Sequence, residues 1–530
     1  MDGSGSGKSA AYSIPNAYQL LGSYVFTDPK GELYDKTAGY LKQNGYDIKV
    51  LNLVRPQYSD GYNPLMHISS EVDVDVIANT IVKGQQSESG KADPYWDDMA
   101  EMLLKALIYY LIATRPEEEQ NLASCAELVR AANNNGGSNL LTELMSQLPY
   151  DHPARMYYKS IEIAPEKTYG SILSSLQSKL GKFDSKEIAE LTSTDTIDFE
   201  EIGQKKTAVY VISSDTHAAY DFLLTIFFSQ MIQQLYDYAD QNGGALKEQT
   251  FFILDEFANI GKVPDFDKKI STSRSRNISF SVILQNVDQL EAVYEKSYET
   301  IMGNCDTHIF LGSNSYKTVE YFSKALGEKT ISKESFSVNR DKKMWRQGYQ
   351  QSEQIMARAL LTPDELRRLD NDICIIYEKG IKPIKAKKFY YFKHSMAKKL
   401  AEHEMDHNDI GEIERGAWRK YNPYNPYVEE EDNKQDDLRV ESLDDLFDEE
   451  IDVKENKKEQ KNDETQSKPK TEKPIEKLDL ENFESNETDQ SKLEEPAPIL
   501  PQFENNSNDE YDLQKELEAK FDELFGPLEN

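Results

Sequence analysis

The chain has 530 residues, of which 38% are hydrophobic and 29% charged, with a formal net charge of −33. This length allows two or three domains with a sizeable buried core. No run of about 18 apolar residues occurs, so the sequence predicts no membrane-spanning helix, and it contains no signal peptide pattern. The 3 cysteines exclude a disulfide framework and favour a reducing compartment.

Most of the negative charge belongs to the C-terminal part of the chain. Residues 428–530 include 35 acidic and 13 basic residues, a net charge of −22, which leaves −11 for residues 1–427. The stretch is poor in aromatic residues, and this composition predicts a disordered acidic tail. Two amphipathic segments within it, 442–450 and 513–525, are interpreted either as residual helix in a spacer or as segments that fold on a partner.

The N-terminus has the pattern of a phosphate-binding loop. Small residues at 3–7 allow backbone N–H groups to point at phosphate oxygens, Lys8 is placed to reach the β- and γ-phosphates, and the Ser9 hydroxyl to ligate Mg²⁺. Asp2 stands where the pattern has its first glycine. The alternative interpretation is an unstructured glycine–serine leader. The candidate nucleotide-binding residues are Gly3, Ser4, Gly5, Ser6, Gly7, Lys8 and Ser9.

Seven apolar stretches predict β-strands. Their apolar residues are continuous rather than alternating, which is typical of strands that are covered on both faces. The sequence therefore predicts an α/β fold with a mostly parallel sheet between helices. The stretches are 23–32, 46–53, 206–214, 250–257, 278–286, 307–313 and 372–380.

Residues 94–186 contain no predicted strand and show only helical patterns. The clearest pattern begins at Pro94, a residue suited to the first turn of a helix. We expect an all-helical domain inserted into the α/β core. The predicted division is 1–93 for the first part of the nucleotide-binding core, 94–190 for the inserted helical domain, 191–400 for the second part of the core, 401–427 for a helical or linker segment, and 428–530 for the tail.

Polar residues follow two of the predicted strands. Asp255 and Glu256 end the stretch 250–257, where an aspartate would hold the Mg²⁺ shell and a glutamate would activate the attacking water. Gln285 ends the stretch 278–286 and is a candidate sensor of the γ-phosphate. The alternatives are an acidic pair at a helix N-terminus and an ordinary polar residue at a strand end.

Two arginines precede the strand that ends at Gln285. Arg274 and Arg276 lie in the stretch STSRSRN, and in a ring of such domains an arginine here can reach the nucleotide of the neighbouring subunit. The alternative is a pair of solvated loop charges.

The stretch HEMDH at 403–407 matches a zinc-hydrolase motif, which requires His403 and His407 on one face of a helix. Asp406 places a charge where such helices usually bury an apolar residue, and the flanking residues are polar. We therefore interpret these residues as exposed histidines near the end of the folded body.

Taken together, the motifs resemble those of the type IV secretion coupling proteins of the TraG/TraD family, in a variant similar to those of Gram-positive conjugative elements. The resemblance covers residues 2–391. It rests on TDPKGELYDKTAGYLKQNGYDIKVLNL, YNPLMHI, FILDEFANIG, SRSRNISFSVILQN, GNCDTHIFLGS and KPIKAKKFYY.

The resemblance implies a RecA-like ATPase core with an inserted helical domain that uses ATP and Mg²⁺. It implies a homo-hexameric ring at the inner face of the membrane, which receives relaxase-bound single-stranded DNA and delivers it, or protein substrates, to the secretion channel. It assigns Asp255 to metal binding, Glu256 to catalysis and Arg274 to the arginine that acts in trans. A second hypothesis is a receptor with weak hydrolysis that recruits the relaxase complex through the helical domain and tail.

Members of this family carry an N-terminal membrane segment and a core strand before the phosphate loop. Only Met1 and Asp2 precede the loop here. The expectation from the sequence is a chain that begins inside its parent protein, as a truncated gene or a late-assigned start. The membrane association of the family would then depend on the missing segment, and this chain by itself would be soluble and cytoplasmic.

Overall fold

A computed structural model describes residues 7–84, 94–133, 140–214, 220–339, 348–411 and 413–426. The predicted tail 428–530 and the loop residues Gly3–Ser6 lie outside this range. Among the described residues, no helix has both the length and the apolar character needed to cross a membrane.

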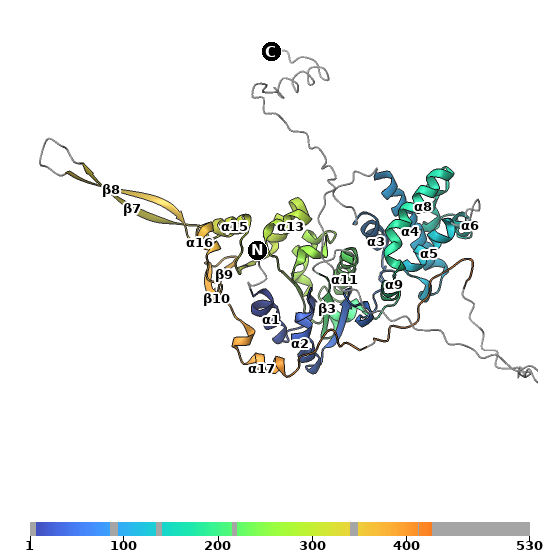
Figure 1. Cartoon of the computed structure of the whole chain (residues 1–530), viewed down its shortest axis with the longest axis horizontal. Helices are drawn as coiled ribbons and strands as arrows, with labels where there is room; N and C mark the ends of the chain where they lie inside the picture. The colour runs from blue at the N-terminus through green and yellow to red at the C-terminus, as the bar shows by residue number, and fades with distance from the viewer. Residues whose placement is uncertain are drawn as a thin grey trace, which may run out of the picture. The chain divides into compact units, whose positions relative to one another are not determined.

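A five-stranded sheet forms the centre of the fold (Figure 1). Its strands pair in the order β2-β3-β1-β4-β5, and every neighbouring pair is parallel. All residues of β1 and β3 are buried, as the continuous apolar runs predict. The strands are β1 (Ser23–Thr27), β2 (Asp47–Asn52), β3 (Thr207–Ile212), β4 (Thr250–Leu254) and β5 (Ile278–Val282).

Successive residues of β1 enter different hydrophobic cores, because side chains alternate between the two faces of a strand. Val25 packs into a large core with helices α3, α4, α5 and α11, whereas Tyr24 and Phe26 pack into a second core with α1 and α2. The parallel sheet is therefore covered on both faces, as the sequence predicts.

Helices connect and cover the strands. Helices α4 to α9 follow one another without an intervening strand among the described residues of that region. We call residues 94–191 the helical insert. That this insert is a separate domain stays a prediction. The helices are α1 (Ile14–Tyr18, after a π-helical turn η2 at Ser9–Ser13), α2 (Glu32–Gln43), α3 (Glu71–Lys83), α4 (Pro94–Thr114), α5 (Leu122–Asn133), α6 (Leu140–Ser146), α7 (Pro153–Glu162), α8 (Glu166–Leu180), α9 (Lys186–Leu191), α10 (Phe199–Gln204), α11 (Asp221–Gln241), α12 (Phe266–Thr272), α13 (Val287–Tyr294), α14 (Tyr298–Asn304), α15 (Tyr316–Leu326), α16 (Pro363–Arg367) and α17 (Met396–Ala401).

The last two predicted strands do not join the parallel sheet. Instead, β6 (Thr307–Phe310) and β9 (Ile373–Glu378) pair antiparallel, and β10 (Ile384–Lys387) completes a separate three-stranded sheet in the order β10-β9-β6. A long hairpin of β7 (Glu328–Asn339) and β8 (Gly348–Ala359) was not predicted, because its strands have no continuous apolar run.

After α17 the chain forms an extended strap rather than the further helix that the prediction for 401–427 allowed. Its described residues, 402–411 and 413–426, contain no helix. The strap first contacts α2, where His407 Nδ1 lies 2.8 Å from Asp35 Oδ1. It then reaches the helical insert, where Arg419 Nε donates to Glu119 Oε1 over 2.9 Å and Tyr421 is buried. The strap therefore links the two regions.

Candidate nucleotide-binding site

One edge of the central sheet brings together five side chains of the predicted site: Lys8, Ser9, Asp255, Glu256 and Gln285. Because β4 and β5 are parallel neighbours, the residues after their carboxyl ends lie side by side. Asp255 and Glu256 follow β4, and Gln285 follows β5. The phosphate-loop helix packs against the same strands, and Tyr12 forms a hydroxyl–hydroxyl hydrogen bond of 2.7 Å with Ser281 of β5.

Lys8 lies at the centre of this group. Its Nζ donates to Glu256 Oε1 over 2.7 Å and is 3.7 Å from Asp255 Oδ1. Both carboxylates and the lysine are largely buried. A cation at this position is attracted to negative charge from any source, so the phosphate oxygens of a bound nucleotide would compete with the two carboxylates for this ammonium group.

Asp255 is fixed from several directions. Ser9 Oγ donates to its Oδ2 over 3.3 Å, the backbone N–H of Glu256 donates to its Oδ1 over 3.0 Å, and Thr27 Oγ1 donates to its backbone carbonyl over 2.7 Å. Burial raises the pKa of Asp255, and the positive charge of Lys8 opposes this shift. A hydroxyl beside a buried carboxylate is the donor set that Mg²⁺ uses together with nucleotide phosphates.

Glu256 has an unusual backbone conformation. Its φ is 53° and its ψ is 44°, in the left-handed region that residues other than glycine rarely adopt. Gln285 Nε2 donates to Glu256 Oε1 over 3.0 Å, so the amide and the carboxylate are already in contact. Strain of this kind persists where surrounding contacts impose it, and it is concentrated at functional sites.

The two arginines lie elsewhere. Arg274 and Arg276 form a short 3-10 turn just before β5, at the end of that strand opposite to Gln285. Arg276 makes a two-pronged contact with Asp240, with both N–O distances at 2.9 Å. Arg274 is exposed. The structure therefore does not bring Arg274 into the site of its own chain.

Two residues near the site were not identified from the sequence. Thr27, at the end of β1, holds the backbone of Asp255, and the ring of Tyr390 packs on the phosphate loop. A β-carbon added at Gly7, whose φ is +77°, would lie 2.7 Å from Tyr390 Cε1. The stretch KPIKAKKFYY, which includes Tyr390, was noted only as part of the family resemblance.

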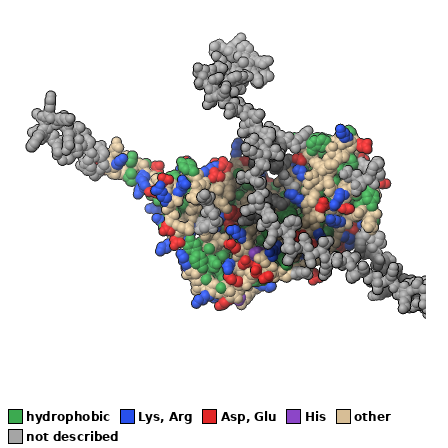
Figure 2. Space-filling model, in the orientation of Figure 1, with side chains coloured by type: hydrophobic (Ala, Val, Ile, Leu, Met, Phe, Trp, Pro, Cys, Tyr) green, Lys and Arg blue, Asp and Glu red, His purple; other side chains and the backbone are tan. Residues whose placement is uncertain are grey.

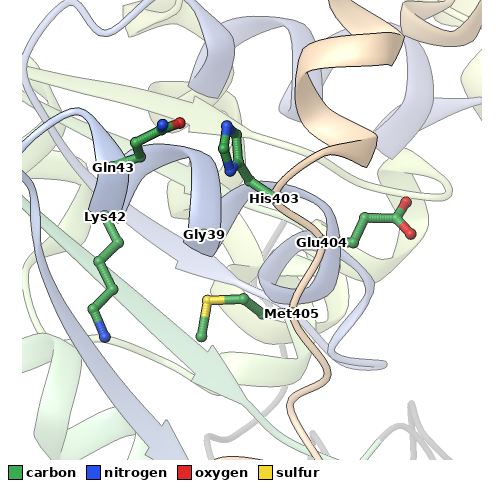
Figure 3. Close-up of a pocket in the computed structure, with 6 residues that line it drawn as sticks. All are labelled: Gly39, Lys42, Gln43, His403, Glu404 and Met405. Carbon is green, nitrogen blue, oxygen red and sulfur yellow. The ribbon is translucent and has the colours of Figure 1, made fainter.

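The HEMDH stretch is not a zinc-hydrolase helix. Helix α17 ends at Ala401, and residues 403–407 cross α2 without forming a helical turn that would align His403 with His407 (Figure 3). With Gly39, Lys42 and Gln43 of α2, residues 403–405 line a hollow of about 400 Å³. His403 and His407 are both partly buried, His407 against Asp35, so the expectation of exposed histidines is wrong.

Known proteins resemble this chain over about three quarters of its length. Residues 1–412 match the family model described as Type IV secretory system Conjugative DNA transfer. The conjugal transfer protein TraG of Escherichia coli is 25% identical over 425 residues, which are 73% of this chain and 66% of that protein. Protein VirD4 of Rhizobium radiobacter is 25% identical over 418 residues, 75% of this chain and 57% of that protein. The chain thus spans less than two thirds of the length of these relatives.

A solved structure has the same fold. The bacterial conjugative coupling protein TrwBdeltaN70, in a trigonal form with sulphate, superposes with a TM-score of 0.50 at 17% identity, covering 73% of this chain and 83% of that one. TrwB with the non-hydrolysable ATP analogue ADPNP superposes with a TM-score of 0.48 at 16% identity, covering 73% and 83%. The fold is the RecA-like fold of the coupling proteins. By its match over residues 1–412, the chain belongs to the type IV secretory family of conjugative DNA transfer proteins.

Proposed function

We propose that this chain is an ATP-driven coupling protein that recruits a relaxase–DNA complex and moves single-stranded DNA, or a protein substrate, toward a secretion channel. The observation that carries the proposal is the convergence of Lys8, Ser9, Asp255, Glu256 and Gln285 at one sheet edge. These are the side chains that phosphoryl transfer to water requires. Membership of the conjugative DNA transfer family supports the choice of substrate.

Each side chain has a distinct role in the proposed mechanism. Lys8 neutralises the β- and γ-phosphates. Ser9 and Asp255 would hold Mg²⁺, which when bound would supply charge stabilisation for the transferred phosphoryl group. Glu256 orients the attacking water and accepts its proton as the water oxygen bonds to the γ-phosphorus and the bond to ADP breaks. Gln285, which already donates to Glu256, fixes the direction of that carboxylate.

The role proposed for Arg274 requires a second subunit. Since Arg274 is exposed and lies away from the site of its own chain, we infer that it acts on the nucleotide of a neighbour. This requires a ring of identical subunits, and we propose a homo-hexamer at the inner face of the membrane. DNA binding would be tolerant of sequence and would weaken with salt, as is usual for contacts to the phosphate backbone.

A second candidate is a receptor with weak hydrolysis. It is favoured by an exposed face beside α6 and α7, where Met156 of α7 is 65% exposed. Tyr150, in the connection between the two helices, is 73% exposed, and both residues line a cavity of about 350 Å³. Arg155 and Lys159 both lie over the ring of Tyr150. Such a mixed apolar and cationic surface suits a protein segment that the helical insert would recruit.

The test is ATP hydrolysis with and without single-stranded DNA, comparing the wild-type chain with Lys8→Ala. The motor predicts hydrolysis that DNA stimulates and that Lys8→Ala abolishes. A folded chain that binds a relaxase–DNA complex equally well with and without Lys8, and that does not hydrolyse ATP, would favour the receptor. Deleting residues 428–530 then separates the two further, because a motor with a spacer tail keeps stimulated hydrolysis, whereas a receptor that depends on its tail loses partner binding.

A further inference from the structure

The segment that follows β10 brings a cluster of aromatic rings to the phosphate loop. Tyr390 is 8% exposed, and its ring edge packs on Gly7 so closely that a β-carbon there would clash. Its hydroxyl donates to the backbone carbonyl of Asn371 over 3.2 Å, which fixes the ring in place. Tyr390 is therefore a rigid contact between this segment and the loop that holds the phosphates.

Phe392 extends this contact outward. Its ring stacks on Tyr390 with centroids 5.2 Å apart and planes inclined by 24°. Phe392 nevertheless remains 55% exposed. Figure 2 shows hydrophobic side chains gathered on the surface of this part of the molecule, around α1 and the segment between β10 and α17. An aromatic face is thus held at the surface, one ring away from Gly7.

The exposure of Phe392 is not explained by core packing. Its neighbour Tyr391 packs against the second hydrophobic core, next to α17 and α2, whereas Phe392 belongs to neither large core. A contiguous patch of exposed apolar side chains commonly marks a binding site. Phe392 belongs, together with the exposed Phe389, to the segment where Figure 2 shows such side chains gathered. The next residue, Lys393, lies over Tyr390 at 4.6 Å from the ring centroid and contacts Asp372. Lys393 therefore does not cover Phe392 from solvent.

We propose that Phe392 is the stacking surface for the base of the bound nucleoside triphosphate, and that Tyr390 is the positioning residue that sets its distance from the phosphate loop. The inference rests on the proposed nucleotide site. When phosphates occupy the loop at Gly7 and Lys8, the base must lie a short distance from them, and the Tyr390–Phe392 stack leads outward from that loop. A ring face binds any base through its π-surface, so this site favours larger purines without strict selection among them.

The experiment measures equilibrium binding to the full chain of a fluorescent ATP analogue labelled on the ribose, with ATP, GTP and inorganic tripolyphosphate as competitors. Phe392→Ala should weaken binding of ATP and GTP about tenfold, the usual effect of losing one base–aromatic stack. It should leave tripolyphosphate binding unchanged, because tripolyphosphate has no base. Phe392→Trp should restore ATP binding. The matched control is Phe389→Ala, an exposed neighbour whose ring stacks instead on His394 at 3.7 Å.

The outcomes separate this inference from the proposed function. If wild-type and Phe392→Ala chains bind ATP equally while Lys8→Ala does not, the base-stacking role is wrong and the nucleotide site stands. If Phe392→Ala weakens ATP and tripolyphosphate by the same factor, the substitution acts on the loop, which also overturns the stacking role. If the folded wild-type chain binds neither compound, the nucleotide site itself is refuted, and the inference falls with it.

Discussion

Lys8 and Glu256 are 248 positions apart in the chain, yet Lys8 Nζ donates to Glu256 Oε1 over 2.7 Å. The two groups that would act on the phosphates and on the attacking water thus neutralise each other. For ATP to bind, Lys8 must exchange this carboxylate for phosphate oxygens, which releases Glu256 toward water. In the proposed mechanism, this ion pair would therefore couple nucleotide binding to the release of Glu256, the proposed general base.

This relationship predicts opposite effects of Glu256→Gln on binding and on catalysis. Hydrolysis should fall by at least about a hundredfold, because an amide cannot accept the proton of the attacking water. ATP affinity should be unchanged or higher, since the phosphates no longer compete with a carboxylate for Lys8. Single-turnover hydrolysis and equilibrium binding, measured on the same preparation, check both parts. Turnover at the wild-type rate would contradict the assignment of the general base.

Arg274 predicts complementation between two inactive chains. Glu256→Gln lacks the base and Arg274→Ala lacks the arginine, so each should be inactive alone. In a mixed ring, an Arg274→Ala subunit keeps an intact Glu256 and can receive Arg274 from a Glu256→Gln neighbour. We expect hydrolysis to return on mixing, measured as phosphate release against the mixing ratio.

Arg276→Ala is the control for that experiment. Arg276 is held by Asp240 within its own chain, so its loss should lower stability without removing an arginine that acts in trans. Mixtures that stay inactive, although both variants assemble with wild-type chains, would exclude a trans role for Arg274.

The burial of Asp28 leads us to expect that the unfolding free energy depends on pH. This residue follows β1, is 2% exposed, and accepts a hydrogen bond from the backbone N–H of Tyr34 over 2.8 Å. Burial raises the pKa of Asp28 from 3.8 to about 7. Between these values the folded chain binds more protons than the unfolded chain, so the contribution of Asp28 to stability is fully present below pH 3.8 and is lost as the pH rises toward 7.

Asp28→Asn removes this titration while keeping an oxygen that accepts the Tyr34 N–H. As the pH rises from 4 to 7, the unfolding free energy of Asp28→Asn should therefore increase relative to that of the wild type. Urea unfolding at a series of pH values measures it. Parallel curves for the two proteins would show that Asp28 has an ordinary pKa.

Tyr421 predicts that the C-terminal strap stabilises the body. Its ring is 6% exposed, Arg115 of the helical insert lies over it at 4.2 Å from the ring centroid, and its backbone N–H donates to Ser124 Oγ over 2.9 Å. Tyr421→Ala should lower the unfolding free energy by about 3 kcal/mol, as expected for an emptied aromatic site. Tyr424→Ala is the matched control, because Tyr424 is 53% exposed. Equal stability of the two variants in urea would argue against a structural role for the strap.

Local sequence patterns were sufficient for most of the strands and for the position of three polar residues at one edge of the sheet. The continuous apolar runs at 206–214 and 250–257 predict buried strands, since only a strand covered on both faces tolerates apolar residues at every position. Asp255, Glu256 and Gln285 follow from their positions after such runs, because parallel strands place their carboxyl ends at one edge. The proximity of these three residues was therefore predictable, whereas the position of Arg274 away from them and the contacts of Thr27 and Tyr390 were not.

Pairing between distant segments was decided only by the tertiary structure. An apolar run indicates that a strand is covered on both faces, but it does not indicate which strand it pairs with. The strands β6 and β9 were therefore expected in the parallel sheet, and instead they pair in an antiparallel sheet. The spacing of HEMDH is compatible with a helix, yet contacts of His407 and Met405 with Asp35 hold that segment in a non-helical path. The packing of Tyr390 on Gly7 joins positions 383 residues apart, and no local pattern specifies such a contact.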